Sequence, residues 1–175
     1  MDLVSKIIAL HEALDTAGLP HAFGGALALA WCTERARGTI DIDVNILIPT
    51  DDFARALAAM PAGVKIGRQD RMQLKRDGQA RLWWDKTPVD LFLNNTAFHE
   101  GIAARVRQET LAGASIPFLS CQDLAVFKAF FNRTKDWADL EEMKNAGTLD
   151  SSQTIATLIP YLGPDDERIE KLQKL

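Results

Sequence analysis

Three aspartates stand in two short stretches where aliphatic and polar residues alternate. Asp41 and Asp43 belong to the run 39–48, and Asp90 belongs to a second run, 89–94. Such alternation is typical of a strand with one buried face, and residues two apart on it lie about 6.5 to 7 Å apart on the same face. Carboxylate oxygens bind hard cations, and metal pairs held by carboxylates support phosphoryl transfer. A solvated strand face with ordinary surface charges explains Asp41 and Asp43 equally well.

A glycine pair, Gly24-Gly25, lies between a short extended stretch at 21–23 and an apolar helix at 26–31. A turn of this kind lets backbone N–H groups and the helix N-terminus approach a phosphate closely. Taken alone, the pair is more readily explained as a tight packing turn, because glycines form turns in proteins of every kind.

The elements that must position these residues are predicted from spacing and capping. Alternation predicts strands at 39–48 and 89–94, and Asp77-Gly78 predicts a hairpin turn between strands at 72–74 and 79–84. Helices are expected at about 2–17, 53–60, 102–111, 120–131 and 137–144, with two short terminal helices divided at Gly163-Pro164. We therefore expect an α/β (α+β) domain with a mixed sheet at 1–115 and a C-terminal helical part at 116–175.

The composition is that of a globular protein. Its 175 residues include 20 Lys and Arg against 24 Asp and Glu, and 47% are hydrophobic. The net charge of −4 removes the simplest signature of nucleic-acid binding, a basic domain. The segment 65–86 is nevertheless locally basic and contains Trp83-Trp84, which predicts either an RNA-binding surface or, more simply, a solvated hairpin.

Cysteine usage and hydropathy give two further expectations. Cys32 and Cys121 stand far apart without a C-x-x-C motif, which predicts neither a disulfide framework nor a zinc site and fits a reducing cytoplasm. No apolar run is long enough to span a bilayer, so we expect no membrane segment.

The motifs gain specificity from their order along the chain. The glycine pair, then Arg37-x-Thr39-x-Asp41-x-Asp43, then Val89-Asp90-Leu91 resemble the minimal nucleotidyltransferase pattern. Residues 21–48 are similar to nucleotidyltransferase-fold proteins of the abortive-infection toxin (AbiEii) type, and Asp123-Leu124-x-x-x-Lys128 and the run 133–140 resemble the C-terminal helices of that group. Many members of the superfamily have Gly-Ser at the turn; this chain has Gly-Gly, which is common in the toxin-like branch.

The resemblance implies a minimal nucleotidyltransferase fold and a role for each matched residue. Asp41 and Asp43 would bind Mg²⁺ or Mn²⁺, while Asp90 would hold the second metal ion and act as general base. The nucleotide would be contacted by Gly24, Gly25, Arg37, Thr39, Lys128 and Lys135. For Arg37 and Thr39, stabilisation of the turn before the aspartate strand is as good an explanation as contact with the nucleotide. For Asp136, a favourable charge at the N-terminus of the following helix is as good an explanation as a polar role at the site.

These roles predict a cytoplasmic enzyme that transfers a nucleoside monophosphate from an NTP to an acceptor hydroxyl and releases pyrophosphate. The toxin-like resemblance favours RNA, such as a tRNA end, as the acceptor and a cognate antitoxin as a partner. A small molecule of the antibiotic type is the alternative acceptor for the same chemistry. The D-x-D pattern also fits a glycosyltransferase, an enzyme class that uses it to hold a metal and a nucleotide sugar. A third alternative is an inactive nucleotide-binding or antitoxin-like module with the same residues.

Overall fold

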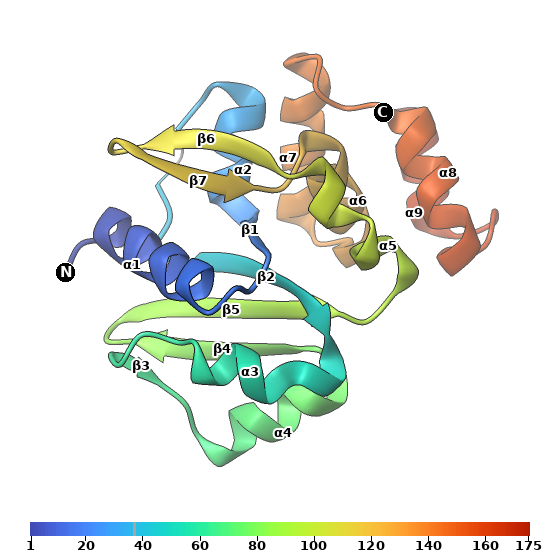
Figure 1. Ribbon diagram of the computed structural model, residues 1–175. Helices are drawn as coiled ribbons and strands as arrows, with labels where there is room; N and C mark the ends of the chain where they lie inside the picture. Colours follow the sequence, from blue (N-terminus) through green and yellow to red (C-terminus); the bar gives the residue numbers. More distant parts are fainter. Residues whose placement is uncertain (37) are drawn as a thin grey trace.

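The computed structural model describes residues 1–36 and 38–175, so the nucleotide contact expected at Arg37 lies outside the described residues. The described chain contains a seven-stranded mixed sheet with the strand order β3-β4-β5-β2-β1-β7-β6 (Figure 1). The strands are β1 (His21–Phe23), β2 (Ile42–Pro49), β3 (Val64–Lys65), β4 (Gln79–Trp84), β5 (Thr87–Asn94), β6 (Arg107–Leu111) and β7 (Ala114–Phe118). The predicted mixed α/β architecture is confirmed, and β7 extends past the division expected at residue 115.

The helices form two groups around this sheet. α3 (Phe53–Ala58) and α4 (Arg68–Asp77) lie beside β3, β4 and β5 (Figure 1). In the other group, α6 (Cys121–Phe131) and α7 (Thr134–Asn145) pack against α2 (Gly25–Thr33), and α8 (Ser151–Leu162) and α9 (Glu167–Lys174) pack on α6. The remaining helices are α1 (Leu3–Thr16), α5 (Ala97–Glu100) and two 3₁₀ turns, Thr50–Asp52 and Ile102–Arg105. The helices expected at 2–17, 120–131 and 137–144 and the terminal pair are therefore confirmed.

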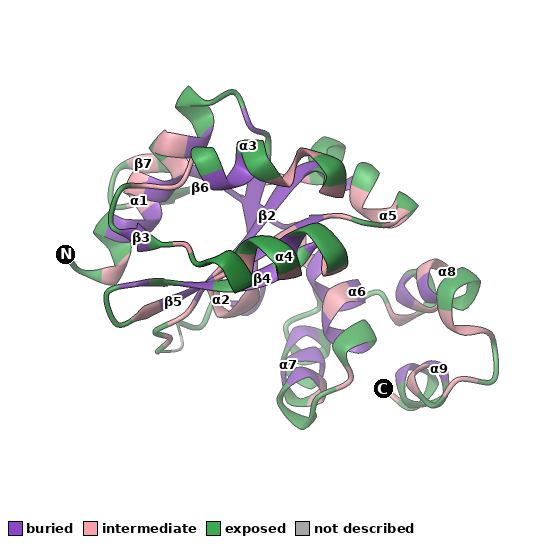
Figure 2. Cartoon of the chain, turned by 90° about the horizontal axis from the view of Figure 1, so that it is seen from below, coloured by how far each residue is buried: buried purple, intermediate pink, exposed green. Residues whose placement is uncertain are grey.

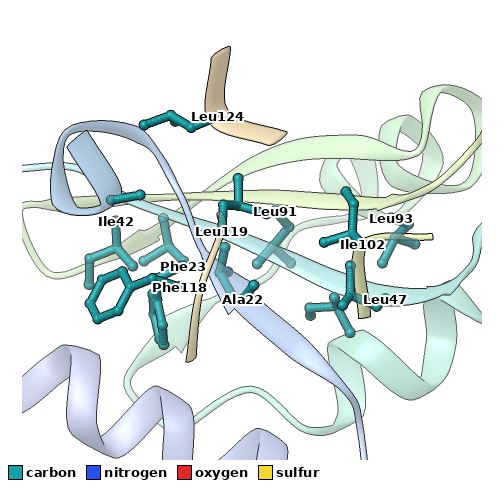
Figure 3. Close-up of a cluster of buried hydrophobic side chains, with 14 of the residues drawn as sticks. Ala22, Phe23, Ile42, Leu47, Leu91, Leu93, Ile102, Phe118, Leu119 and Leu124 are labelled. Carbon is teal, nitrogen blue, oxygen red and sulfur yellow. The ribbon is translucent and has the colours of Figure 1, made fainter. Parts of the chain in front are cut away.

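The hydrophobic core is centred on β2 and β5, which run parallel in the middle of the sheet. Ile42, Val44 and Leu91 are fully buried, as strand alternation requires of the row facing the core. Figure 3 shows how side chains from β1, β2, β5 and β7 gather here, with Phe23 next to Phe118. In Figure 2 the helices show buried inner faces and exposed outer faces, and the outer face of α4 is broadly exposed. The two central strands thus pack on the core through their apolar face.

The hairpin predicted at Asp77-Gly78 is wrong. The segment before it is helix α4, and Gly78 ends that helix with a φ of +69°. The hairpin lies one strand later, where β4 and β5 pair antiparallel on either side of 85–86. A glycine in the left-handed region suits both a helix C-terminus and a two-residue hairpin turn, so the dipeptide alone does not distinguish them.

The helix predicted at 102–111 is also wrong. A 3₁₀ turn is followed by β6, which pairs antiparallel with β7. Ala112 and Gly113 both have positive φ, the conformation that a tight two-residue hairpin turn needs. β6 is an edge strand along which exposed and half-buried side chains alternate, so few of its side chains reach the core. The spacing of its apolar residues therefore did not distinguish a strand from a helix.

Cys32 and Cys121 form a disulfide, contrary to the expectation that they are unpaired. Their Cα atoms lie 5.6 Å apart, and the bond ties α2 to the first residue of α6. A separation of 89 residues along the chain gave no sign of this contact. The placement in a reducing compartment rested on unpaired cysteines and stays a prediction. Separately, none of the described helices combines the length and the apolarity that a membrane span needs.

Candidate active site

Adjacent parallel strands bring two of the three aspartates side by side. Asp43 on β2 is the register partner of Asp90 on β5, and Asp41 stands directly before β2. The neighbours Ile42 and Val89 are fully buried, so the aspartates occupy the opposite face of the sheet. Register partners on adjacent strands lie about 4.8 Å apart. The sheet therefore brings the three carboxyl groups together on one face of its central strands.

An arginine on the third strand neutralises part of this acidic group. Arg81 on β4 lies opposite Asp90 and donates two hydrogen bonds to its carboxylate, from Nε to Oδ1 and from Nη2 to Oδ2, both at 2.7 Å. The same Nη2 atom lies 3.7 Å from Oδ2 of Asp41. Hydrogen bonding to Asp90 raises the pKa of Arg81, so the guanidinium stays charged. Asp41 and Asp90 thus already share one cation, which places their carboxylates around a common point.

Asp43 is the carboxyl group with the most strongly shifted pKa at this site. Burial is the largest cause, and together with the negative charges of Asp90 and Asp41 it raises the pKa of Asp43 from 3.8 to about 6, while Lys128 and Lys135 act in the opposite direction. The protein therefore does not fully neutralise the negative charge here. A bound cation would relieve both the desolvation and the repulsion.

The glycine turn is built around the Asp43 side chain. The N–H of Gly24 donates to the backbone carbonyl of Asp43 at 2.9 Å. Gly25 has a φ of +56°, and a Cβ at this position would lie 1.9 Å from Oδ2 of Asp43, well inside the repulsive range. Gly25 is therefore required for packing against Asp43, as expected of a tight packing turn. It also lines the same small pocket as Asp43 and Lys128, so its backbone faces the acidic group.

The lysines and acids of the C-terminal helices form a second, buried charge group. Lys128 on α6 donates to Oδ2 of Asp139 at 2.6 Å and lies 3.8 Å from Oδ1 of Asp136. Asp136 also accepts hydrogen bonds from the backbone N–H and the guanidinium of Arg133, so it does serve as the charge at the N-terminus of α7. Lys135 is exposed on α7. The two lysines expected to contact the nucleotide therefore differ in their surroundings. Lys128 already shares its charge with two aspartates, whereas Lys135 is exposed to solvent.

Two cavities give access to the carboxylates. A pocket of about 40 Å³ between the glycine turn and α6 is lined by Gly25, Asp43, Lys128 and Arg133, among others. An open groove of about 300 Å³ runs over Asp43, Asp90 and Arg81 and is also lined by Gln73 of α4. Sequence reasoning missed Arg81 and Arg133 as site residues. The alternation of β4 was the available signal for Arg81, because it places an arginine on the face opposite Leu82.

Thr39 and the basic segment 65–86 have structural partners. The N–H of Asp41 donates to the hydroxyl oxygen of Thr39 at 3.2 Å, so Thr39 supports the turn that leads to Asp41. Within the basic segment, Arg76 forms two hydrogen bonds with Asp77, and Arg81 is held by Asp90. Two of the charges expected to face RNA are therefore paired with carboxylates of the protein.

The donor set fits a hard divalent cation. In the part of the chain that the structure describes, no three His, Cys, Asp or Glu side chains are grouped as a ready-made metal cluster. Asp41 and Asp90 nevertheless surround one positive group, and Asp43 retains a negative charge that its neighbours repel. Carboxylate oxygens with an excess of negative charge are the ligands that Mg²⁺ and Mn²⁺ prefer. These three residues would hold such an ion once Arg81 withdraws.

Comparison with known proteins gives a match in fold. No family model and no curated protein matches the sequence. The crystal structure of ANT(2'')-Ia in complex with adenylyl-2''-tobramycin aligns with a TM-score of 0.62 and 16% identity, covering 87% of this chain and 92% of that one. The solution structure of the antibiotic-resistance factor ANT(2'')-Ia aligns with a TM-score of 0.57 and 17% sequence identity, and the alignment covers 98% of this chain and 89% of that one. The crystal structure of an antigenic nucleotidyltransferase-like protein from Paracoccidioides brasiliensis aligns with a TM-score of 0.54 and 12% sequence identity, and the alignment covers 98% of this chain and 92% of that one.

At these identities the likeness concerns the fold. The chain has a nucleotidyltransferase fold followed by C-terminal helices, as predicted. The three alignments each cover most of both chains, so the helical part is included in the match. Membership of the AbiEii-type branch stays a prediction from the sequence.

Proposed function

We propose that the protein is a Mg²⁺- or Mn²⁺-dependent nucleotidyltransferase that transfers a nucleoside monophosphate from an NTP such as ATP to an acceptor hydroxyl. The observation that carries the proposal is the convergence of three carboxyl groups on one face of the central strands: Asp43 and Asp90 are register partners, and Asp41 and Asp90 share Arg81. The fold supports it, because proteins of this fold include nucleotidyltransferases.

Each step of the transfer has a residue in reach. Asp90 accepts the proton of the acceptor hydroxyl, whose oxygen forms a bond to the α-phosphorus while the bond from that phosphorus to the pyrophosphate oxygen breaks. The positive charges of Arg133 and Lys135 stabilise the phosphates that leave, and Lys128 contributes to the same field. The bound metal ion would supply charge stabilisation for the transferring phosphoryl group.

Arg81 must leave Asp90 before this proton transfer. Both carboxylate oxygens of Asp90 accept hydrogen bonds from the guanidinium of Arg81, so neither is open to the acceptor hydroxyl while that pair is in place. The side chain of Arg81 is half exposed, so it has room to rotate away from Asp90 and toward nucleotide phosphates in the groove. We expect metal and nucleotide binding to release Asp90 in this way.

The acceptor is the open part of the proposal. RNA, with a tRNA end as the specific case and a cognate antitoxin as regulator, rests on the sequence resemblance of residues 21–48. An antibiotic-type small molecule is the alternative, and the likeness to ANT(2'')-Ia in fold alone does not favour it over RNA.

The proposal is tested by incubating the full chain with each α-labelled NTP, Mg²⁺, total RNA and a set of small alcohols, and measuring pyrophosphate and labelled product. We expect label transfer that disappears in excess EDTA and in the variants Asp41→Asn and Asp43→Asn. Asp51→Asn, an exposed residue outside the site, is the matched control and should keep full activity. Absence of pyrophosphate release with every NTP would support the inactive module instead. Activity that persists in EDTA would contradict the metal requirement.

A further inference from the structure

An aromatic cavity lies next to the carboxylate groove, between the sheet and helices α5, α6 and α8. Its volume is about 140 Å³. The helices that enclose it are drawn close together in Figure 2, beyond the ends of β4 and β5. The main apolar lining consists of Phe98, Phe127, Phe130, Phe131, Leu158 and Tyr161.

The rings of this cavity pack in specific geometries. Phe98 meets Phe127 edge to face, with ring centroids 5.4 Å apart, and Phe127 is stacked with Phe131 at 6.4 Å. Aromatic pairs prefer these arrangements, so the walls are ordered rather than loosely filled. An apolar cavity of about 150 Å³ takes a benzene molecule. The cavity thus matches one six-membered ring in size.

Several of its polar groups already have partners within the protein. Tyr161 Oη accepts a hydrogen bond from the N–H of Phe98 at 3.1 Å, and the Thr96 hydroxyl pairs with Nδ1 of His99 at 2.6 Å. The Asn95 amide donates to the carbonyl of Asp77 at 3.3 Å. A nucleobase would bury several polar edge atoms here with few partners left, which is unfavourable. An apolar ring has no such requirement.

The cavity is also nearly free of charge. None of the described residues that line it is acidic. Burial lowers the pKa of His99, so its ring is neutral near pH 7. A bound polyamine would need carboxylates to compensate for the hydration that its charges lose, and a bound phosphate would need cations for the same reason. The occupant is therefore uncharged.

The cavity borders the groove that holds the proposed general base. Gln79, Phe92 and Phe131 line both the cavity and the groove over Asp43, Asp90 and Arg81. Phe92 is two residues from Asp90 on β5, on the same face of the strand. A molecule in the cavity can therefore extend a substituent along β5 to Asp90.

We propose that this cavity binds the acceptor, and that the acceptor is an uncharged alcohol carrying an apolar ring of about the size of benzene. The inference rests on the proposed function for the transfer itself. The ring lies among Phe98, Phe127 and Phe131, and the hydroxyl reaches Asp90. There the hydroxyl proton passes to the Asp90 carboxylate, the oxygen bonds to the α-phosphorus, and pyrophosphate leaves.

The binding part is tested with benzyl alcohol as the probe, by titrating the full chain and following its NMR spectrum. We expect saturable binding with a dissociation constant on the order of 1 mM, as a ligand of this size allows. Phe130→Ala should weaken binding at least about fivefold, as loss of an aromatic contact does. Trp83→Ala, which removes an equally exposed ring on β4, is the matched control and should leave it unchanged.

Two results would overturn the cavity assignment. One is the absence of saturable binding by the wild-type chain, or equal affinity in wild type and Phe130→Ala. The other is a fivefold loss of NTP affinity in Phe130→Ala, because that would place the nucleotide base in the cavity.

Transfer assays separate this inference from the proposed function. Benzyl alcohol probes the ring site alone, so the transfer assay uses 4-phenylbutan-1-ol, whose chain can carry the hydroxyl from the ring site along β5 toward Asp90. We expect label from an NTP to appear on this alcohol, with a rate reduced by Phe130→Ala and not by Trp83→Ala. Transfer to RNA that Phe130→Ala leaves unchanged would overturn the acceptor class while the nucleotidyltransferase proposal stands. Binding of benzyl alcohol without pyrophosphate release from any NTP, with any acceptor, would contradict the proposed function and leave the cavity as a ligand site.

Discussion

Two groups of opposite charges flank Asp43, and they differ in burial. On the sheet side, Arg81 pairs with Asp90, and the two side chains are 50% and 17% exposed. On the helical side, Lys128 pairs with Asp139, and the two side chains are 7% and 2% exposed. An exposed pair contributes little to stability and exchanges its partners, whereas removing one partner from a buried pair is strongly destabilising.

The difference assigns the two groups different roles. The Arg81 pair is exchangeable, so a metal ion and phosphates can replace it. The Lys128 group is a permanent part of the framework that joins α6 to α7, and it lowers the pKa of Asp43 from a fixed position. The changes below are designed to break one group and leave the other intact.

The largest effect is expected from breaking the buried group. Lys128→Met keeps the length of the side chain but removes the cation between Asp136 and Asp139, both of which are buried. We expect the free energy of unfolding to fall by about 3 to 5 kcal/mol, measured by urea denaturation. Lys135→Met, on the exposed side of α7, should change it by less than about 0.5 kcal/mol. Similar stability in the two variants would show that the Lys128 pair is not a fixed part of the framework.

A second effect follows from the raised pKa of Asp43. Its pKa is about 6 in the folded protein and 3.8 ordinarily, so the folded chain holds this proton more tightly than the unfolded chain. Ionisation therefore destabilises the fold: the penalty is absent below pH 3.8, grows between pH 3.8 and 6, and is complete above that. In metal-free buffer Asp43→Asn should exceed the wild type in stability at pH 7 by on the order of 3 kcal/mol.

The pH dependence provides the check on that prediction. The stability difference between Asp43→Asn and wild type should shrink as the pH is lowered from 7 to 5. Asp51→Asn is exposed and away from the site, so its difference from wild type should stay flat. A wild-type chain that is more stable than Asp43→Asn at pH 7 would mean that the carboxylate is satisfied without a metal ion.

The smallest stability effect is expected from the exchangeable pair. Arg81→Ala should change the free energy of unfolding by less than about 1 kcal/mol. It should, however, tighten Mn²⁺ binding, because the guanidinium no longer competes for Asp41 and Asp90. Arg76→Ala, which removes a similar exposed pair with Asp77, is the control and should leave Mn²⁺ affinity unchanged. Weaker Mn²⁺ binding in Arg81→Ala would rule out the competition.

The sheet side of the site was readable from the sequence, and the reason is physical. Aspartate is unfavourable in strands, so Asp43 and Asp90 inside alternating runs stood out. The same alternation predicted β2 and β5, and the order of the motifs predicted the fold. That the two aspartates would be register partners depended on the strand order, which a single sequence does not specify.

The helical side was much less readable. Phe127 and Phe131 are spaced as core residues are, so nothing in the sequence separates a cavity wall from a filled core. Gly78 was assigned to the wrong turn because its left-handed conformation serves two purposes. The Cys32–Cys121 bond joins segments that only the tertiary fold brings together. These features depend on packing between distant segments, which local pattern does not record.

The central claim is that the three carboxylates form a nucleotidyl-transfer site with Asp90 as base. The most direct measurement is the rate of pyrophosphate release by Asp90→Asn at saturating Mg²⁺, together with its NTP affinity. The variant keeps the size of the side chain but cannot accept the proton. We expect the rate to fall at least about a hundredfold, with NTP affinity changed far less because Asp41 and Asp43 remain. A turnover close to that of the wild-type protein would contradict the account.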